Sequence, residues 1–192
     1  MGSIYLKNVV GLAQSSIWIY SIPLKHIVMA AHYNGKIPRN PFAMYHVDPD
    51  HKEREFLTLD ELTAMTEIKL EDPNMAFARD LFIFGSWTGI AFIDIKNLTE
   101  DNISMVNGAH WIVSKRQKTG VPFQIKLLDI PMQIVERYKS FRNGNHLFNI
   151  GNLGSINKRI KKVAVMCGIK KRVSFHVSRH KWEYHKNSTI NI

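Results

Sequence analysis

The chain has 192 residues, of which 45% are hydrophobic and 22% charged, so its composition is that of an ordinary folded protein. A formal net charge of +10 favours a polyanionic partner, either nucleic acid or an anionic membrane surface. The single cysteine, Cys167, excludes an internal disulfide framework and a zinc site built only from cysteines. No apolar run reaches the roughly 18 residues of a membrane span, and no signal peptide is evident. We therefore expect a cytoplasmic protein.

The positive charge is concentrated in the second half of the sequence. Residues 1–100 hold 9 Lys and Arg against 12 Asp and Glu, a net charge of −3, whereas residues 101–192 hold 17 against 4, a net charge of +13. The second half is therefore the expected contact surface for an acidic polymer. The alternative interpretation is a basic face that is merely solvated.

The first part of the chain predicts helices. Residues 4–35 show apolar side chains at helical spacing and are expected to form two short helices separated by Pro23. Residues 1–42 are too few for a stable domain and indicate the end of a larger one. Residues 43–55 are polar, contain Pro49 and alternate in charge, which is typical of a linker.

A second domain is expected over residues 56–192, and its first two helices have clear local signals. Thr58 and Glu61 have the spacing of a capping box, in which each side chain satisfies a free backbone N–H at a helix start. This pattern predicts a helix over residues 59–68. Residues 75–87 predict a second helix that is apolar on nearly every face after Asp80 and is therefore buried. Gly89 offers that helix a stop.

Residues 111–128 predict a β-hairpin whose turn, residues 117–120, ends in glycine. Four residues are expected on its inner face, where they alternate with polar residues or proline: Val121, Phe123, Ile125 and Leu127. The expected fold class is mainly α, an α+β domain with a small antiparallel sheet.

Three further helical segments are expected after the hairpin. The first has Pro131 at its start and an apolar stripe that continues through Val135 to Phe141. The second is a basic helix with Ser155 as its cap, ending at Gly168. The third begins near residue 174.

Three stretches together resemble a known family. They are Glu55-Phe56-Leu57-Thr58-Leu59-Asp60-Glu61-Leu62, Arg116-Gln117-Lys118-Thr119-Gly120 and His176-Val177-Ser178-Arg179-His180. In their order and spacing they resemble the catalytic domain of the tyrosine recombinases of the phage-integrase type, and they are most similar to integrases of Bacteroides-type mobile elements. Residues 24–42 resemble the last helix of the core-binding domain that precedes it. The resemblance covers residues 24–180 and implies a core-binding end at 1–42, a linker at 43–55 and a catalytic domain at 56–192, which we expect to be C-terminally incomplete and truncated before the nucleophilic tyrosine.

The resemblance implies a DNA-binding protein of site-specific recombination or integration. In this family a tyrosine attacks a DNA phosphodiester, two arginines clamp the phosphate, and a hairpin lysine protonates the leaving oxygen. The resemblance gives these roles to Lys118 as general acid, His176 as the box histidine and Arg179 as a clamp arginine. His180 and Asp94 are expected to support the site structurally. The alternatives are a solvated turn lysine, a buried structural histidine and a surface arginine.

The sequence departs from the family pattern in two places. Ala91 stands where the family carries its first clamp arginine, and Arg79 is a speculative replacement that is more simply a structural arginine at the helix surface. Twelve residues follow His180, and Tyr184 is too close to Arg179 to be the usual nucleophile. We therefore identify no nucleophile in the chain and expect that it does not cut DNA alone.

Other function classes remain open at this stage. One is a non-catalytic DNA-binding remnant of a recombinase. A metal hydrolase is another, because His176 and His180 stand at a spacing that metal sites use, although no third ligand is obvious. An RNA-binding protein is a third, without an aromatic stacking motif to support it. We expect duplex DNA as partner, oligomers on DNA as in the tetrameric family assemblies, no cofactor, no metal and no membrane.

Overall fold

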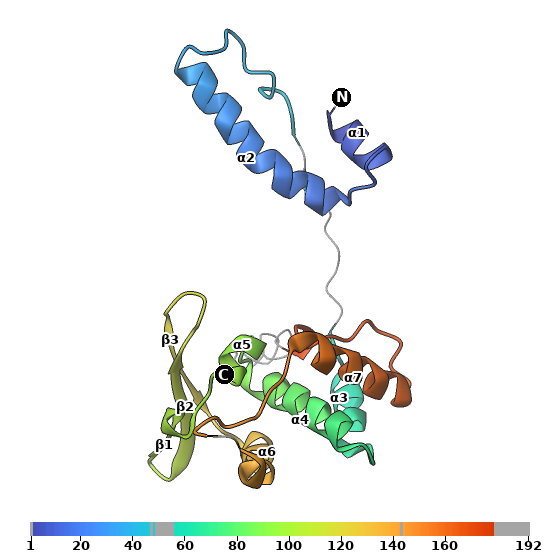
Figure 1. The fold of residues 1–192 in the computed structure, drawn as a ribbon, viewed down its shortest axis with the longest axis vertical. Coiled ribbons are helices and arrows are strands. Elements are labelled where there is room, and N and C mark those ends of the chain that lie inside the picture. The colour runs from blue at the N-terminus through green and yellow to red at the C-terminus, as the bar shows by residue number, and fades with distance from the viewer. Residues whose placement is uncertain (1, 47, 49–55, 143, 179–192) are drawn as a thin grey trace, which may run out of the picture. The chain divides into compact units, whose positions relative to one another are not determined.

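The structure, a computed structural model, describes residues 2–46, 48, 56–142 and 144–178, with side chains from residue 5 onward. The chain divides into two units, Met1–Arg54 and Glu55–Ile192 (Figure 1). Most of the expected linker, residues 43–55, lies outside the described residues. No helix of the described residues is long and apolar enough to cross a membrane.

The first unit contains helices α1, Gly2–Asn8, and α2, Gln14–Tyr33. The expected break at Pro23 is wrong, because this proline lies inside the 20-residue α2. Proline lacks an N–H, so the carbonyl of Ile19 loses its intrahelical donor. Ile19 is exposed, and water can satisfy that carbonyl, so one missing bond does not end the helix.

The second unit is mainly helical, with one small sheet. Its elements are α3 (Leu59–Glu67), α4 (Pro73–Thr88), α5 (Phe92–Lys96), the 3₁₀ turn η1 (Glu100–Asn102), β1 (Ile103–Val106), β2 (Ala109–Lys115), β3 (Pro122–Lys126), α6 (Asp129–Arg137), the 3₁₀ turn η2 (Lys139–Phe141) and α7 (Leu153–Met166). Helix α4 contacts α3, α6 and α7, so it forms the centre of the core (Figure 1). The expected mainly α class with a small antiparallel sheet is confirmed.

The two helix signals at the start of this unit are confirmed. Thr58 Oγ1 accepts from the Glu61 N–H at 3.2 Å, and Glu61 Oε2 accepts from the Thr58 N–H at 2.7 Å, so the capping box forms and α3 begins at Leu59. Residues 78–86 of α4 are all buried, as their apolar composition predicts. Gly89 ends α4 with a left-handed φ of 66°, a conformation that favours glycine.

The sheet has three antiparallel strands in the order β1-β2-β3, and β1 was not expected from the sequence. The register of the predicted hairpin pairs Trp111 with Lys126 and Lys115 with Pro122. Val121 is 56% exposed, so its expected inward position is wrong. The residue lies in the connecting loop, before the alternation of β3 begins.

The basic helix α7 starts earlier than expected. Asn152 is its cap, because its Oδ1 accepts from the Ser155 N–H at 2.8 Å, so Ser155 lies in the first turn and is not the cap. The buried face of α7 includes Ile156, Ile160 and Val163. In the preceding helical segment Val135 is buried, but Phe141 is 70% exposed and lies beyond α6 in η2, so its place on the apolar stripe is wrong.

A buried carboxylate joins α4 to α6. Asp80 accepts hydrogen bonds from Arg137 at 2.7 Å and from the Tyr138 hydroxyl at 2.8 Å. Burial, together with the bond to Asp80, raises the pKa of the Tyr138 phenol. The phenol therefore stays protonated and donates to the carboxylate at neutral pH.

Candidate functional site

Lys118 lies at the exposed tip of the loop that joins β2 to β3. The base of this loop is closed by two backbone hydrogen bonds, from the Arg116 N–H to the Val121 carbonyl and from the Gly120 N–H to the Arg116 carbonyl, both 2.8 Å. Gly120 has a φ of 69°, which lets the chain reverse at this point. The loop therefore presents the Lys118 ammonium to solvent from a defined turn.

Asp94 anchors this loop to helix α5. Its side chain is 4% exposed, and its Oδ1 accepts from the Gln117 N–H at 2.8 Å. The Arg116 guanidinium lies 3.5 Å from the other carboxylate oxygen and 5.4 Å from the centroid of the Phe123 ring. A charged acceptor makes a stronger hydrogen bond than a neutral one, so the base of the turn is fixed one residue before Lys118.

His176 and Ala91 line the same small pocket. Its volume is about 140 Å³. It is lined by Ala91, Phe92, Leu153, Asn157, Ser174, Phe175 and His176. Ala91 caps the start of α5, the helix that also carries Asp94. The position at which the family resemblance expects an arginine is therefore next to the expected box histidine, and α5 connects both to the Lys118 hairpin.

The turn that carries His176 contacts α4, α5 and α7, whereas His176 itself is exposed. Phe175 is 2% exposed, and its ring contacts the Phe82 and Phe92 rings with centroid distances of 6.4 and 5.1 Å. Its N–H donates to Asn157 Oδ1 of α7 at 2.8 Å. Within the turn, the buried Ser178 hydroxyl donates to the Phe175 carbonyl at 2.7 Å. Burial of Phe175 and Ser178, on either side of His176 in the turn, thus directs His176 outward.

Gly85 of α4 allows the turn that carries His176 to pack closely against this helix. A β-carbon added at Gly85 would lie 2.9 Å from Ser178 Oγ and 3.0 Å from the Phe175 ring. Real β-carbons almost never approach other atoms so closely, so only glycine fits beneath the turn at this position. A glycine inside an apolar helix is the sequence signal that could have identified this residue.

Arg79 has a structural role, as its simpler interpretation expects, but its expected position at the helix surface is wrong. It is 8% exposed and therefore not at the helix surface. Its guanidinium donates to the carbonyls of Met65, Thr66 and Ile68 at 2.8 to 3.2 Å, which satisfies the end of α3. It is also paired with Asp80 at 2.5 Å. The described geometry commits Arg79 to the core and gives no support to its replacing the first clamp arginine.

The remaining expected site residues lie outside the described part of the chain. Arg179, His180 and Tyr184 are among residues 179–192. Sequence reasoning did not identify Asn157, because nothing local distinguishes a helix asparagine that binds a backbone group 18 residues away. Within the described residues, no group of three or more His, Cys, Asp or Glu side chains could hold a metal ion.

Comparison with known proteins gives likeness in structure only. No protein-family model and no curated protein sequence matches the chain. The structure of the Tn1549 transposon integrase in complex with circular-intermediate DNA matches with a TM-score of 0.75 and 17% identity, over 96% of this chain and 70% of the integrase chain.

Two further solved structures have the same likeness. A lambda integrase dimer bound to a COC′ core site matches with a TM-score of 0.72 and 17% identity, over 92% of this chain and 68% of that one. The XerH site-specific recombinase bound to palindromic difH substrate matches with a TM-score of 0.74 and 15% identity, over 97% of this chain and 61% of that one.

The chain thus spans between 61% and 70% of the length of the chains in these three solved structures. All three are DNA-bound integrases or recombinases, and at identities of 15 to 17% the likeness concerns the fold. The helical second unit with its three-stranded sheet has the fold of the tyrosine recombinase catalytic domain.

Proposed function

We propose that this chain binds duplex DNA as a site-specific recombinase or integrase of the tyrosine class. The observation that carries the proposal is the arrangement around α5. Its N-cap residue, Ala91, lines a pocket with His176, and its buried Asp94 holds the hairpin that presents Lys118. This arrangement supports a site in which one backbone phosphate lies between the hairpin tip and the His176 turn.

The chemistry of these side chains suits a phosphodiester. A Lys118 ammonium on an exposed loop is able to reach the oxygen that leaves when the backbone is cut and to protonate it. The exposed imidazole of His176, on a turn that packs against the core, is able to orient a phosphate oxygen or move a proton. Arg179 is proposed as the clamp arginine and His180 as its structural neighbour, from the sequence resemblance alone.

The charge distribution supports a phosphate-binding surface. Helix α7 has its apolar face in the core and exposes Lys158, Lys161 and Lys162. These lysines belong to the half of the chain that has a net charge of +13. Binding through backbone phosphates releases counterions, so the affinity should fall steeply with salt.

The finer parts of the assignment are also proposals. Residues 1–42 are proposed as the end of a core-binding domain, supported by exposed apolar side chains on α2 such as Tyr20, Ile27 and Tyr33. We assign the protein to a mobile element of Bacteroides type, and we propose that several copies assemble on DNA. The sequence motifs support the first of these, and the family resemblance supports the second.

A second candidate function is DNA binding without strand cleavage, and Ala91 favours it. One charge-assisted phosphate contact in a catalytic site is worth several kcal/mol, roughly 3 to 4 in measured oxyanion sites. The described residues lining the pocket beside Ala91 include no arginine or lysine. A protein of this kind would hold DNA, or hold it for a partner protomer, without the covalent step.

The test is binding of a labelled duplex of arbitrary sequence, measured by fluorescence anisotropy over a range of salt concentrations. We expect affinity to fall linearly with log salt, and K118Q to reduce the magnitude of the slope by about 0.9, the value for one lost phosphate contact. K139Q is the matched control, because Lys139 lies on η2 and pairs with Glu136 at 3.6 Å. Affinity that does not depend on salt would refute the proposal.

A second measurement separates the two candidate functions. The protein is incubated with DNA, denatured and examined for a protein–DNA adduct that survives denaturation. An adduct supports the recombinase, since the covalent intermediate of the tyrosine class links protein to the 3′-phosphate. Salt-dependent binding without any adduct supports the DNA-holding protein.

A further inference from the structure

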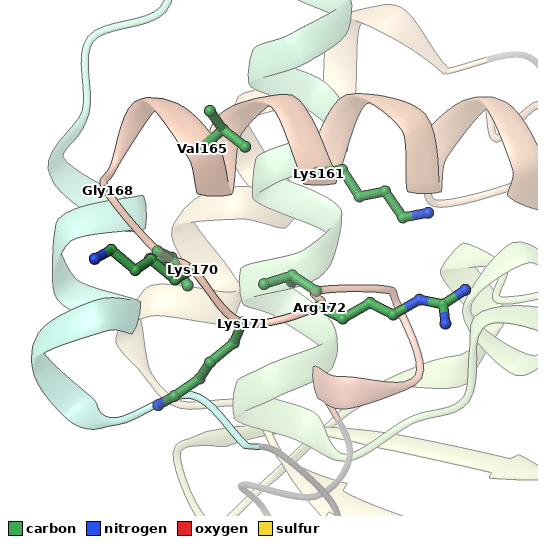
Figure 2. A pocket seen from close by; sticks show the side chains of 8 residues that line it. Lys161, Val165, Gly168, Lys170, Lys171 and Arg172 are labelled. Carbon is green, nitrogen blue, oxygen red and sulfur yellow. The ribbon is translucent and has the colours of Figure 1, made fainter.

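A basic pocket lies beyond the candidate site, between α7 and the segment that follows it. Its volume is about 620 Å³. Four cationic residues, Lys161, Lys170, Lys171 and Arg172, and three apolar residues, Val165, Ile169 and Val173, line it together with Gly168 (Figure 2). No acidic residue lines it among the described residues. The pocket therefore combines an apolar floor with a positively charged rim.

The four cations do not have the same role. The Lys171 ammonium donates to the Phe56 carbonyl at 3.0 Å and to Glu61 at 2.7 Å, so it is committed to the start of α3. Figure 2 shows Lys170 extending toward one end of the pocket, whereas Lys161 and Arg172 extend together toward the other end. Lys161 and Arg172 come from opposite walls, α7 and the segment 169–173, so they form a pair across the pocket.

This pair continues the row of residues that forms the candidate site. Leu153 and Asn157 of α7 line the pocket beside His176, and Lys161 stands one further turn along the same helix face. On the facing segment, Arg172 comes two residues before Ser174, which also lines the His176 pocket. Four helical residues advance about 6 Å along the helix. Phosphates of one DNA strand are spaced about 3.4 Å along the duplex axis, so this advance corresponds to fewer than two phosphate steps.

We propose that Lys161 and Arg172 bind a second backbone phosphate of the same DNA strand, close to the phosphate at the His176 turn. The inference rests on the proposed DNA-binding function and adds a subsite to it. Two cations from opposite walls hold the phosphate by charge, and the guanidinium adds two parallel donors. Val165, which is 73% exposed, offers an apolar surface to a sugar next to the phosphate.

The test compares the salt dependence of duplex binding for the variants K161Q, R172Q and the double variant. We expect each single change to lower the magnitude of the slope of log affinity against log salt by about 0.9 and the double change by about 1.8. K139Q, with the same change of charge outside the pocket, should leave the slope unchanged. R172K should retain most of the wild-type slope, since it preserves the charge.

The outcomes are distinct from failure of the proposed function. If the wild type shows no salt-dependent binding, the DNA-binding function itself is refuted. If the wild type binds and K161Q, R172Q and the double variant keep its slope, only this subsite is refuted. A further experiment measures how well polyglutamate competes with the duplex for binding. If the double change weakens binding of polyglutamate as much as binding of duplex, the pocket takes acidic peptides and the phosphate assignment is overturned.

Discussion

At the scale of single residues, the position of His176 depends on side chains that have no chemistry of their own. Gly85 leaves room beneath the turn, Phe175 fills the space between α4 and α5, and Asn157 binds the backbone of the turn. Each of these contacts orients the exposed imidazole through its buried neighbours. A change at such a residue is expected to alter stability and DNA binding together.

The substitution G85A tests this dependence. The added methyl would lie 2.9 Å from Ser178 Oγ and 3.0 Å from the Phe175 ring. Both neighbours are buried and have little freedom to move, so we expect a loss of about 1 to 3 kcal/mol in the free energy of unfolding, the usual cost of overpacking. Urea unfolding measures the loss, and anisotropy on the same duplex should show weaker DNA binding because the His176 turn is displaced.

The control for this prediction is another helical glycine. Gly154 lies in the first turn of α7, and its nearest neighbour to an added β-carbon is Asn152 Oδ1 at 3.4 Å, an ordinary contact. G154A should leave the protein as stable as the wild type or more stable by about 0.4 to 1 kcal/mol. Equal stability of G85A and G154A would show that the turn does not sit tightly on α4.

At the scale of elements, the hairpin and α5 act as one unit because side chains of α5 and its C-cap residue join them: the Asp94 carboxylate, and the Asn97 side-chain amide, which donates to the Gln117 side chain. Asp94 is buried on α5, and it reaches the backbone N–H of Gln117 and the guanidinium of Arg116. The sheet register by itself fixes β2 and β3 but not the direction of the loop between them. The direction in which Lys118 is presented is therefore set from outside the sheet.

The substitutions D94A and D94N separate the two contacts of this carboxylate. D94A removes both and should cost about 1.5 to 3 kcal/mol of stability, the range for hydrogen bonds to a charged group. D94N keeps an oxygen that accepts from the Gln117 N–H, so its cost should be smaller. Hydrogen exchange of the Gln117 amide should be fastest in D94A, intermediate in D94N and slowest in the wild type.

The internal control is the amide of Ile112, which lies in the middle of β2 and is fully buried. Its exchange should be the same in all three proteins, because the ladder does not depend on Asp94. If the Gln117 amide exchanges equally in all three, the carboxylate does not anchor the loop.

At the scale of the whole molecule, the sequence predicted those features whose causes are local. The capping box at Thr58 and Glu61 and the stop at Gly89 each depend on residues a few positions apart, and both formed as expected. The burial of α4 also followed from its composition. The cap of α7 was misplaced because Asn152 and Ser155 are both good capping residues, and only the backbone geometry distinguishes them.

The sequence did not predict the contacts that bring distant segments together. Asp94 binds a backbone group 23 residues away, and Lys171 binds Glu61 across 110 residues. Such pairs form because the other helices pack around α4, and the hydrophobic periodicity of the sequence does not predict that packing. The family resemblance named Lys118 and His176 as site residues, but it gave no account of the side chains that hold them in place.

The Lys171–Glu61 pair, which connects the basic segment before His176 to α3, predicts a dependence of stability on acid pH. Burial alone would raise the pKa of Glu61, but the Lys171 ammonium and the Thr58 hydrogen bonds outweigh it and hold that pKa below its usual value. The stability that the ionised carboxylate contributes is therefore fully present above the unfolded-state pKa, about 4.3, and is lost as the pH falls through the lower folded-state value.

The variant E61Q isolates this effect, because glutamine still accepts from the Thr58 N–H but carries no charge. Both partners are partly exposed, so we expect E61Q to lose less than about 1 kcal/mol at neutral pH. The difference between wild type and E61Q should shrink as the pH is lowered from about 5 to 3, as the wild-type carboxylate takes up its proton. Urea unfolding at a series of pH values measures it, with D60N as the control for an exposed acid in the same helix turn. A difference that stays constant through this range would mean that the Glu61 charge does not stabilise the connection between α3 and the segment that leads to the site.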